Sequence, residues 1–288
     1  MAANTDLTFW LTRWNLAPSL VIGAVLIIGL YCYALGPYHT RYYPNTPIKH
    51  IQTIAFMLGM LIMLLALISP LDALGDDYLF SAHMLQHLCL TTFGPPLLFV
   101  GTPEWMFERL LNTRAVFLVT KGLVWAPVAF VLYNADFLLW HIPSLYNATL
   151  ENETIHIFEH ATFIFFGILS WWPILSRSSK LPRLSLGGQV LYIFLMGMPA
   201  VLLGAGLTFM PPLYAPYLSD PIAWDISHVV DQQLGGLIMW IPVNLFYIVI
   251  MSGLFIRWMQ RQEARQVEAE RAGDTIDNDA GLLNSRVN

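Results

Sequence analysis

The chain contains eight histidines, and four of them form two pairs with i, i+4 spacing: His83 with His87, and His156 with His160. Side chains four residues apart lie on one face of an α-helix, about one turn apart. Each pair can therefore direct two imidazoles at one point. Neutral imidazole is a ligand for copper, zinc, iron and nickel. Two such pairs on neighbouring helices predict a metal site inside a bundle, as inward-facing carboxylates and histidines form in other helical bundles.

Four further residues are candidate members of the same site. Glu159 lies between the histidines of the second pair, His141 and His228 lie elsewhere in the chain, and Asp231 follows His228 by three positions. A carboxylate near an imidazole either binds the metal or orients the ring that does. The alternative interpretation is that these residues cap helices or contact lipid headgroups. Two pairs together with two further histidines favour the metal.

These residues belong to a strongly apolar chain. Of its 288 residues, 56% are hydrophobic and 11% are charged, whereas soluble domains average about 25% charged residues. Continuous apolar runs of about 20 residues are long enough to cross a bilayer. The absence of a basic patch excludes nucleic acid as an expected partner. We predict an all-α polytopic membrane protein, a seven-transmembrane-helix bundle with spans at residues 17–36, 50–70, 81–101, 114–140, 153–175, 187–209 and 230–256.

Charge is divided between alternate connections of this bundle. The first, third and fifth connections and the tail carry the basic residues, whereas the second, fourth and sixth carry aspartate and glutamate. The positive-inside rule then predicts an N-terminus outside and a cytoplasmic C-terminus. His39 and His50 fall at the inner side, where we interpret them as interfacial. The other six share the extracytoplasmic mouth: His83, His87, His141, His156, His160 and His228.

The same pattern divides the chain into three parts. Residues 1–16 form an extracytoplasmic N-terminal segment, residues 17–256 the transmembrane domain, and residues 257–288 a cytoplasmic tail. The N-terminal segment has no basic start and no cleavage site, so the first span is expected to be a retained helix. The polar end of the tail, from residue 274, is predicted to be disordered because it contains few residues that could form a core.

Sulfur-containing side chains give a weaker signal. Cys32 and Cys89 each stand alone, which excludes a thiolate transfer site of the CxxC type. Met57, Met60 and Met63 spread over one side of the second span. Thioethers suit Cu(I), but methionine is also a common apolar gap-filler. Packing is the favoured interpretation for these methionines, and a part in metal transfer stays open.

Four sequence blocks, in this order, resemble the CtaG family of cytochrome c oxidase assembly factors. They are HMLQHL at 83–88, LWHIP at 139–143, HIFEH at 156–160 with WWP at 171–173, and DQQLGGLIMW at 231–240. The resemblance covers roughly residues 15–260. It implies a non-enzymatic protein of the bacterial cytoplasmic (inner) membrane that serves the maturation of haem-copper oxidases through copper. It also places His83, His87, His156, His160 and Asp231 in the working site.

The resulting hypothesis is a copper-binding assembly factor in which copper is the expected metal and zinc the alternative. Copper would arrive from a periplasmic donor, bind the histidines at the outer mouth, and pass to a haem-copper oxidase subunit. Imidazole ligands suit an oxidising compartment, where exposed cysteines would be oxidised. Membrane lipids are the expected surroundings, and a homo-oligomer stays open.

Three other functions stay open. His156, Glu159 and His160 match the HxxEH zinc-peptidase signature, in which the glutamate is the general base. A membrane metallohydrolase would use Glu159 or Asp231 in that role. A haem protein would need two facing axial histidines. A transporter would need polar groups through the whole membrane depth, and the inner half of the predicted spans has few.

Overall fold

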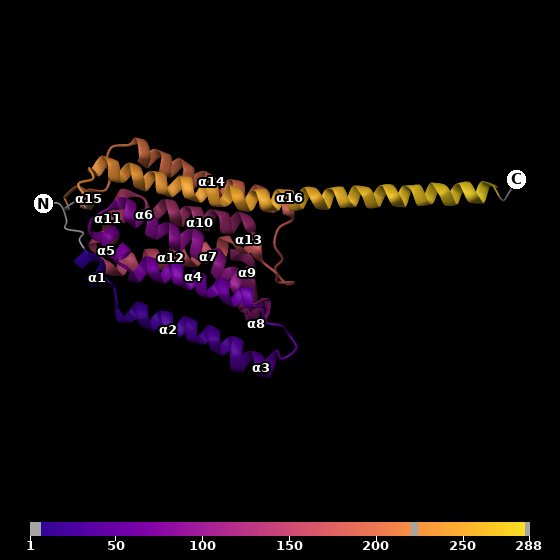
Figure 1. Cartoon of the computed structure of the whole chain (residues 1–288), viewed down its shortest axis with the longest axis horizontal. Coiled ribbons are helices and arrows are strands. Elements are labelled where there is room, and N and C mark those ends of the chain that lie inside the picture. Colours follow the sequence, from indigo (N-terminus) through magenta and orange to yellow (C-terminus); the bar gives the residue numbers. More distant parts are fainter. Residues whose placement is uncertain (1–6, 220–223, 286–288) are drawn as a thin grey trace.

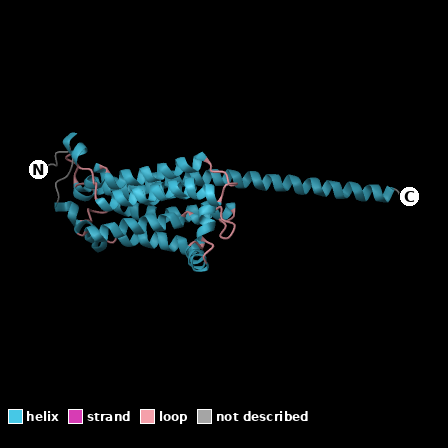
Figure 2. Ribbon diagram, turned by 90° about the horizontal axis from the view of Figure 1, so that it is seen from below, coloured by secondary structure: helices cyan, strands magenta, loops and turns pink. Residues whose placement is uncertain are grey.

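The computed structural model describes residues 7–219 and 224–285, and its regular structure over these residues is entirely helical (Figure 2). The helices are α, apart from two short π-helical segments, η1 and η2. In chain order they are α1 (Leu7–Thr12), α2 (Pro18–Tyr33), η1 (Ala34–Tyr38), α3 (His39–Tyr42), α4 (His50–Ile68), α5 (Pro70–Asp77), α6 (Phe80–Leu88), η2 (Cys89–Phe93), α7 (Gly94–Gly101), α8 (Glu104–Leu110), α9 (Arg114–Leu123), α10 (Ala126–Trp140), α11 (Pro143–Glu151), α12 (Glu153–Ser170), α13 (Trp172–Leu175), α14 (Leu186–Phe209), α15 (Ala215–Ser219) and α16 (His228–Ser285).

Long helices form a bundle whose short helices gather at its two ends (Figure 1). Helices α1, α5, α11 and α15 lie at one end, which we call the α5 end. Helices α3, α8, α9 and α13 lie at the other, which we call the α8 end. Helix α16 starts at the α5 end, crosses the bundle and projects beyond the α8 end (Figure 1). The two ends of the described chain therefore lie on opposite sides of the bundle.

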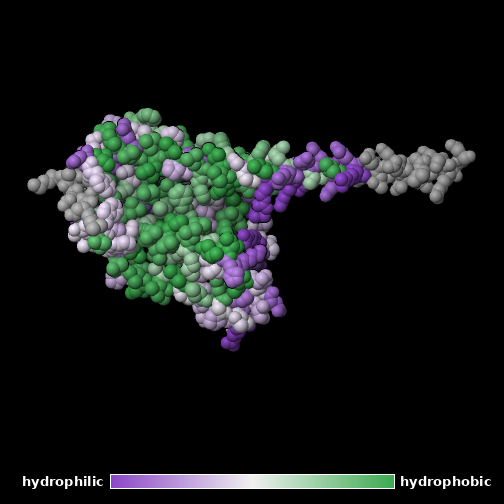
Figure 3. All heavy atoms as spheres, in the orientation of Figure 1, coloured by the Kyte–Doolittle hydropathy of each residue, from purple (hydrophilic) through white to green (hydrophobic). Residues whose placement is uncertain are grey.

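Several of these helices can cross a membrane, so the chain is a multi-pass membrane protein. Five helices are long and apolar enough: Pro18–Tyr42, His50–Ile68, Glu153–Leu175, Leu186–Phe209 and His228–Arg271. Helices α9 and α10, bent by 70° at their junction, make a sixth if they count as one span. A continuous hydrophobic belt covers this part of the molecule (Figure 3). These helices agree with five of the seven predicted spans, and with a sixth if the bent pair is one span.

The predicted span at 81–101 is helical but is not among these helices. It consists of α6, η2 and α7, which together connect the α5 end to the α8 end (Figure 1). Histidines, a glutamine and two threonines lower its mean hydropathy. Almost every side chain of α6 is buried against other helices. The segment is thus an internal helix of the bundle, and its π-helical turn, a feature often found at functional sites, precedes Pro95 and Pro96.

Small residues allow the helices around α6 to approach closely. A Cβ atom on Gly236 of α16 would lie 2.5 Å from Thr208 Oγ1 and 2.7 Å from the Gly204 carbonyl oxygen of α14. A Cβ on Gly235 would lie 2.4 Å from the Phe80 ring of α6. Small residues are typical of packed helices in membranes, because dispersion contacts there replace the hydrophobic effect as the driving force. The glycine pair places α16 directly against both α14 and α6.

Charged side chains follow the two ends of the bundle. Arg41, Arg109 and Arg114 belong to α3, α8 and α9 at the α8 end, whereas Asp72 and Asp76 belong to α5. The charge separation expected between alternate connections is therefore present in space.

Helix α16 continues to Ser285, beyond residue 274, where the sequence predicted that ordered structure ends. The division into N-terminal segment, membrane domain and tail stays a prediction.

The close packing at Gly236 predicts a measurable cost for one added methyl group. Gly236→Ala should lower the stability of the detergent-solubilised protein by ~1–3 kcal/mol, because overpacking forces the backbones of α14 and α16 apart. Gly253→Ala on the same helix is the matched control, since nothing lies within 4 Å of its added Cβ. Both substitutions gain the same helix propensity, ~1 kcal/mol. The midpoint temperature of thermal unfolding should be clearly lower for Gly236→Ala than for Gly253→Ala. Equal midpoints would contradict the packing argument.

Candidate metal site

Helix α6 begins at an anchor supplied by α16. Asp231 Oδ2 accepts a hydrogen bond of 2.7 Å from the Phe80 N–H, and Oδ1 accepts bonds from the N–H and hydroxyl of Ser81. The first N–H groups of a helix have no partner within the helix, and a negative charge is favourable there. Asp231, predicted as a member of the metal site, is thus placed at the start of α6 with both oxygens engaged.

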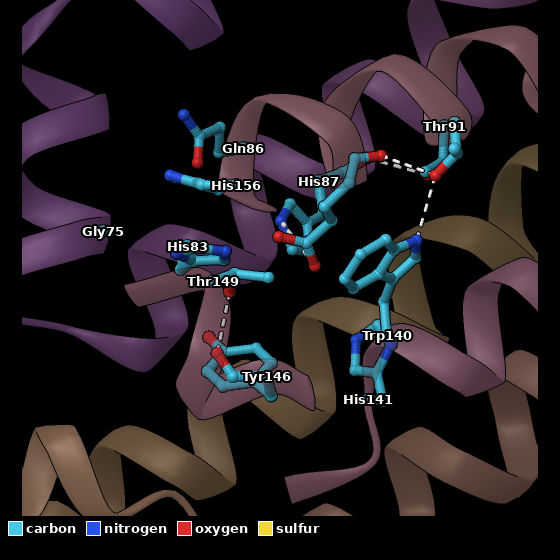
Figure 4. A network of polar contacts seen from close by, with 12 residues as sticks. Gly75, His83, Gln86, His87, Thr91, Trp140, His141, Tyr146, Thr149 and His156 are labelled. Carbon is cyan, nitrogen blue, oxygen red and sulfur yellow. Dashed lines mark hydrogen bonds and ion pairs between the residues drawn. The ribbon is translucent and has the colours of Figure 1, made fainter. Parts of the chain in front are cut away.

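The two histidine pairs meet as the sequence predicts. Ring centroids are 4.2 Å apart for His83 and His87 on α6, and 4.2 Å apart for His156 and His160 on α12. Across the two helices, the His83 and His156 rings are 5.3 Å apart and the His87 and His160 rings 5.4 Å apart. Figure 4 shows His83, His87 and His156 gathered between the helices. Four imidazoles therefore form one cluster near the α5 end.

Glu159 completes this group, which we call the imidazole cluster: His83, His87, His156, Glu159 and His160. One ligand atom from each residue lies within 4.8 Å of all the others. Two nitrogen ligands on one ion, each at about 2 Å, are at most about 4 Å apart. Small side-chain movements would therefore bring the five atoms onto one ion.

The cluster is buried and its polar atoms are unsatisfied. His83 and Glu159 are 0% exposed, and His87 is 3% exposed. Within the described part of the chain, both Glu159 oxygens and the Nε2 atoms of all four imidazoles lack a hydrogen-bond partner. Buried polar groups nearly always have hydrogen-bond partners, so a cluster of buried polar atoms without partners needs an explanation, such as a bound ion. The donor set, four imidazoles and a carboxylate, fits copper or zinc.

Asp76 on α5 is a neighbour of the cluster that sequence reasoning missed. Its Oδ1 lies 3.2 Å from His83 Nδ1, and its Oδ2 lies 3.6 Å from His156 Nδ1. Burial raises the pKa of the Asp76 carboxyl to about 6. The charge of His156 opposes this rise, and the charge of Asp77 adds to it. A carboxylate facing Nδ1 fixes the proton there and leaves Nε2 for a metal. The sequence analysis treated the aspartates of this connection only as part of the charge pattern, and the one further signal was the short separation between Asp76 and His83.

Close packing brings Asp76 to the histidines. A Cβ on the neighbouring Gly75 would lie 2.9 Å from His83 Cα, so only glycine allows α5 this near to α6. Gln86 of α6 donates bonds to the Ala66 carbonyl, at 3.1 Å, and to Asp72 Oδ1, at 2.7 Å. Asn15 donates to the other Asp72 oxygen, at 2.7 Å. Helix α6 is thereby held to α4, to α5 and to the N-terminal segment.

The remaining predicted members lie outside the imidazole cluster. The His141 ring is 6.2 Å from the His87 ring, and its Nδ1 is 2.7 Å from the Phe137 carbonyl oxygen. His228 starts α16, near Asp231 rather than the four imidazoles. At the α8 end, His39 Nε2 contacts the Thr46 carbonyl oxygen at 2.8 Å. His141 is therefore adjacent to the cluster, whereas Asp231 anchors α6 and His228 lies near Asp231 at the start of α16.

Comparison with known proteins shows the family to which the chain belongs. A family model described as cytochrome c oxidase caa3 assembly factor (Caa3_CtaG) matches residues 29–261. The chain belongs to this family. The matched region contains all five residues of the imidazole cluster, together with Asp76, His141 and Asp231. The predicted resemblance is therefore confirmed: the chain is a member of the Caa3_CtaG family.

Similar curated proteins come from mycobacteria. Uncharacterized protein Mb0105 of Mycobacterium bovis is 27% identical over 93% of this chain and 43% of its own length. Uncharacterized protein ML1998 of Mycobacterium leprae is 24% identical over 96% of this chain and 44% of its own length. The chain thus spans less than half the length of these relatives. No solved structure is significantly similar to it.

The position of Asp231 predicts that it stabilises α6 without binding metal. Asp231→Asn keeps the side-chain shape but loses one acceptor oxygen at the start of α6, which should cost ~1–2 kcal/mol, as loss of a helix cap does. Metal stoichiometry should be unchanged, because Asp231 lies outside the imidazole cluster. Thermal unfolding and metal analysis on one preparation measure both effects. Loss of metal from a variant of normal stability would instead make Asp231 a ligand.

Proposed function

We propose that this Caa3_CtaG family member binds copper at the imidazole cluster and helps to insert it into a haem-copper cytochrome c oxidase. The observation that carries the proposal is the convergence of four buried imidazoles and a carboxylate whose ligand atoms lie within 4.8 Å of one another. Family membership supports the assembly role. Imidazole without thiolate binds copper while avoiding the oxidation that cysteine would suffer in an oxidising compartment.

The proposed topology has seven spans, with Phe80–Gly101 as the internal one. A polar span is costly unless its side chains face the bundle interior, and α6 buries His83, Gln86 and His87 in that way. The basic residues at the α8 end make it the cytoplasmic end by the positive-inside rule. The N-terminus and the imidazole cluster are then extracytoplasmic, and the C-terminus is cytoplasmic. This topology belongs to the cytoplasmic membrane of a bacterium.

Copper is the cargo in this proposal, and the exposed members of the site mark its route. The Asp76 and His156 side chains are 29% and 13% exposed, whereas Glu159 is 0% exposed. An incoming ion would therefore meet the Asp76 carboxylate and His156 first. It would then exchange water for His83, His87 and His160 deeper in the bundle. Release to an oxidase subunit would reverse these steps at the same mouth, and a periplasmic donor would load it there.

The copper site is tested with a pair of double variants. His83→Ala/His87→Ala removes two of the four imidazoles and should abolish copper retention after loading and dialysis. His50→Ala/His228→Ala removes two histidines outside the imidazole cluster and should bind as much copper as wild type. Metal analysis of the purified proteins measures both, and oxidase copper content in cells carrying each variant tests the assembly role. Equal copper in the two double variants would rule out this site.

One observation keeps a metallohydrolase as the second candidate. Glu159 of the HxxEH motif lies inside the imidazole cluster, and its Oε1 is 3.8 Å from His87 Nε2. As a general base, Glu159 would act on a metal-bound water. As a ligand or a support for His87, it would strengthen metal binding itself.

Glu159→Gln separates the two roles. In the copper carrier, the variant should bind copper ~10–100-fold more weakly, the effect typical of losing a group that supports the ligands. Competition with a chelator of known affinity measures this change. Unchanged affinity together with loss of an amide- or lipid-hydrolysing activity would favour the hydrolase.

A further inference from the structure

A small internal cavity lies next to the imidazole cluster. Its volume is about 20 Å³, and it is bounded by helices α6, α10, α14 and α16. A cavity of this size holds one water molecule or one ion. Two of its lining residues, His87 and His141, are histidines. Its position extends the polar site from the mouth toward the interior of the bundle.

His141 offers this cavity a free ligand atom. Its Nδ1 lies 2.7 Å from the Phe137 carbonyl oxygen, which can only accept, so the ring proton is assigned to Nδ1. Nε2 then carries a lone pair. The His141 side chain is 4% exposed, and its Nε2 is buried without a hydrogen-bond partner among the described residues. A histidine that donates one ring N–H to a backbone carbonyl and leaves the other nitrogen bare is typical of metal ligands.

Three methionines on three helices also line this cavity. Met84 of α6, Met196 of α14 and Met239 of α16 are 1%, 4% and 5% exposed. Asn134 Nδ2 contacts the Met196 sulfur at 3.6 Å and so restricts its position. Thioether sulfur is a soft ligand that selects Cu(I) over divalent metals. Together with the bare His141 nitrogen, these sulfurs form a donor set different from that of the imidazole cluster.

The methionines discussed from the sequence provide a contrast. Met60 and Met63 pack in an apolar core with Tyr31, Phe56 and Leu90, and Met57 packs against that core. These three methionines fill space, as their sequence spacing favoured. The methionines that share a cavity with histidines are others.

We propose that this cavity is a second copper site, selective for Cu(I), in which Met84, Met196 and Met239 surround one ion that is bound by His141 Nε2. The biological role of this site rests on the proposed function, whereas its ability to bind Cu(I) does not depend on that function. His87 lines the cavity and also belongs to the imidazole cluster. Its ring is 5.4 Å from the His160 ring and 6.2 Å from the His141 ring. Cu(I) can therefore pass between the two sites through His87 without leaving the protein.

The test counts soft monovalent ions in matched methionine variants. Full-length protein carrying Cys32→Ser and Cys89→Ala, which removes competing thiols, is loaded with Ag(I) or with Cu(I) under ascorbate. Met84→Leu/Met196→Leu/Met239→Leu preserves side-chain volume and is well tolerated in packed cores. It should bind one ion fewer than its parent and should lose the metal–sulfur scattering in X-ray absorption spectra. The control, Met57→Leu/Met60→Leu/Met63→Leu, makes the same three changes elsewhere. It should keep the ion count and the metal–sulfur scattering of its parent.

Two further variants keep the outcomes distinct. His141→Ala should weaken binding at the sulfur site at least tenfold and leave the methionines in place. His156→Ala/His160→Ala should remove the ion held by imidazoles and keep the sulfur signal. Sulfur scattering and stoichiometry that persist in the Met84, Met196 and Met239 variant would overturn the second site. An unchanged ion count in the His156 and His160 variant would overturn the imidazole site of the proposed function.

Discussion

A helix that carries two histidines, a glutamine and two threonines cannot face lipid without leaving polar atoms unsatisfied, and each such atom costs free energy in a medium that offers no hydrogen bonds. The arrangement of the bundle follows from this constraint. The segment Phe80–Gly101 is enclosed by other helices, whereas the long apolar helices expose many of their large hydrophobic side chains. The Gln86 amide nitrogen donates to Ala66 and Asp72, whereas the Nε2 atoms of the four imidazoles have no hydrogen-bond partner among the described residues. Among the described residues, most buried side-chain polar atoms without a hydrogen-bond partner therefore lie at the site.

Enclosure of α6 depends on close helix packing and on one ionic anchor. Gly75, Gly204, Gly235 and Gly236 lie where a Cβ would meet a neighbouring helix or ring. Asp231 fixes the start of α6 by accepting from the Phe80 and Ser81 N–H groups. The family block around residues 231–240 therefore acts mainly by positioning: the aspartate holds α6, and the two glycines let α16 approach α14 and α6. Residues far from the imidazoles in sequence decide where those imidazoles lie.

The site joins a polar mouth to a sulfur-lined interior. Asp76 and His156 are its accessible members, Glu159 and His83 are fully buried, and His87 connects the cluster to the cavity beside His141. The proposed ligands change along this line from carboxylate and imidazole to imidazole and thioether. Harder ligands suit an ion arriving with its water shell, and softer ligands suit a dehydrated Cu(I). This gradient is an arrangement suited to accepting an ion, holding it and returning it.

The sequence by itself determined the helical class, five or six of the candidate membrane spans, the separation of charge between the two ends and the two histidine pairs. Hydropathy, charge and i, i+4 spacing are local properties, so they can be read without the fold. The sequence also located Glu159 within the cluster, as that residue shares a helical turn with its histidines. Tertiary structure alone decided that Asp76 joins the histidines, that Asp231 anchors α6, and that Met84, Met196 and Met239 meet around one cavity. These contacts join helices distant in the chain, and their distances depend on glycine packing that no local pattern encodes.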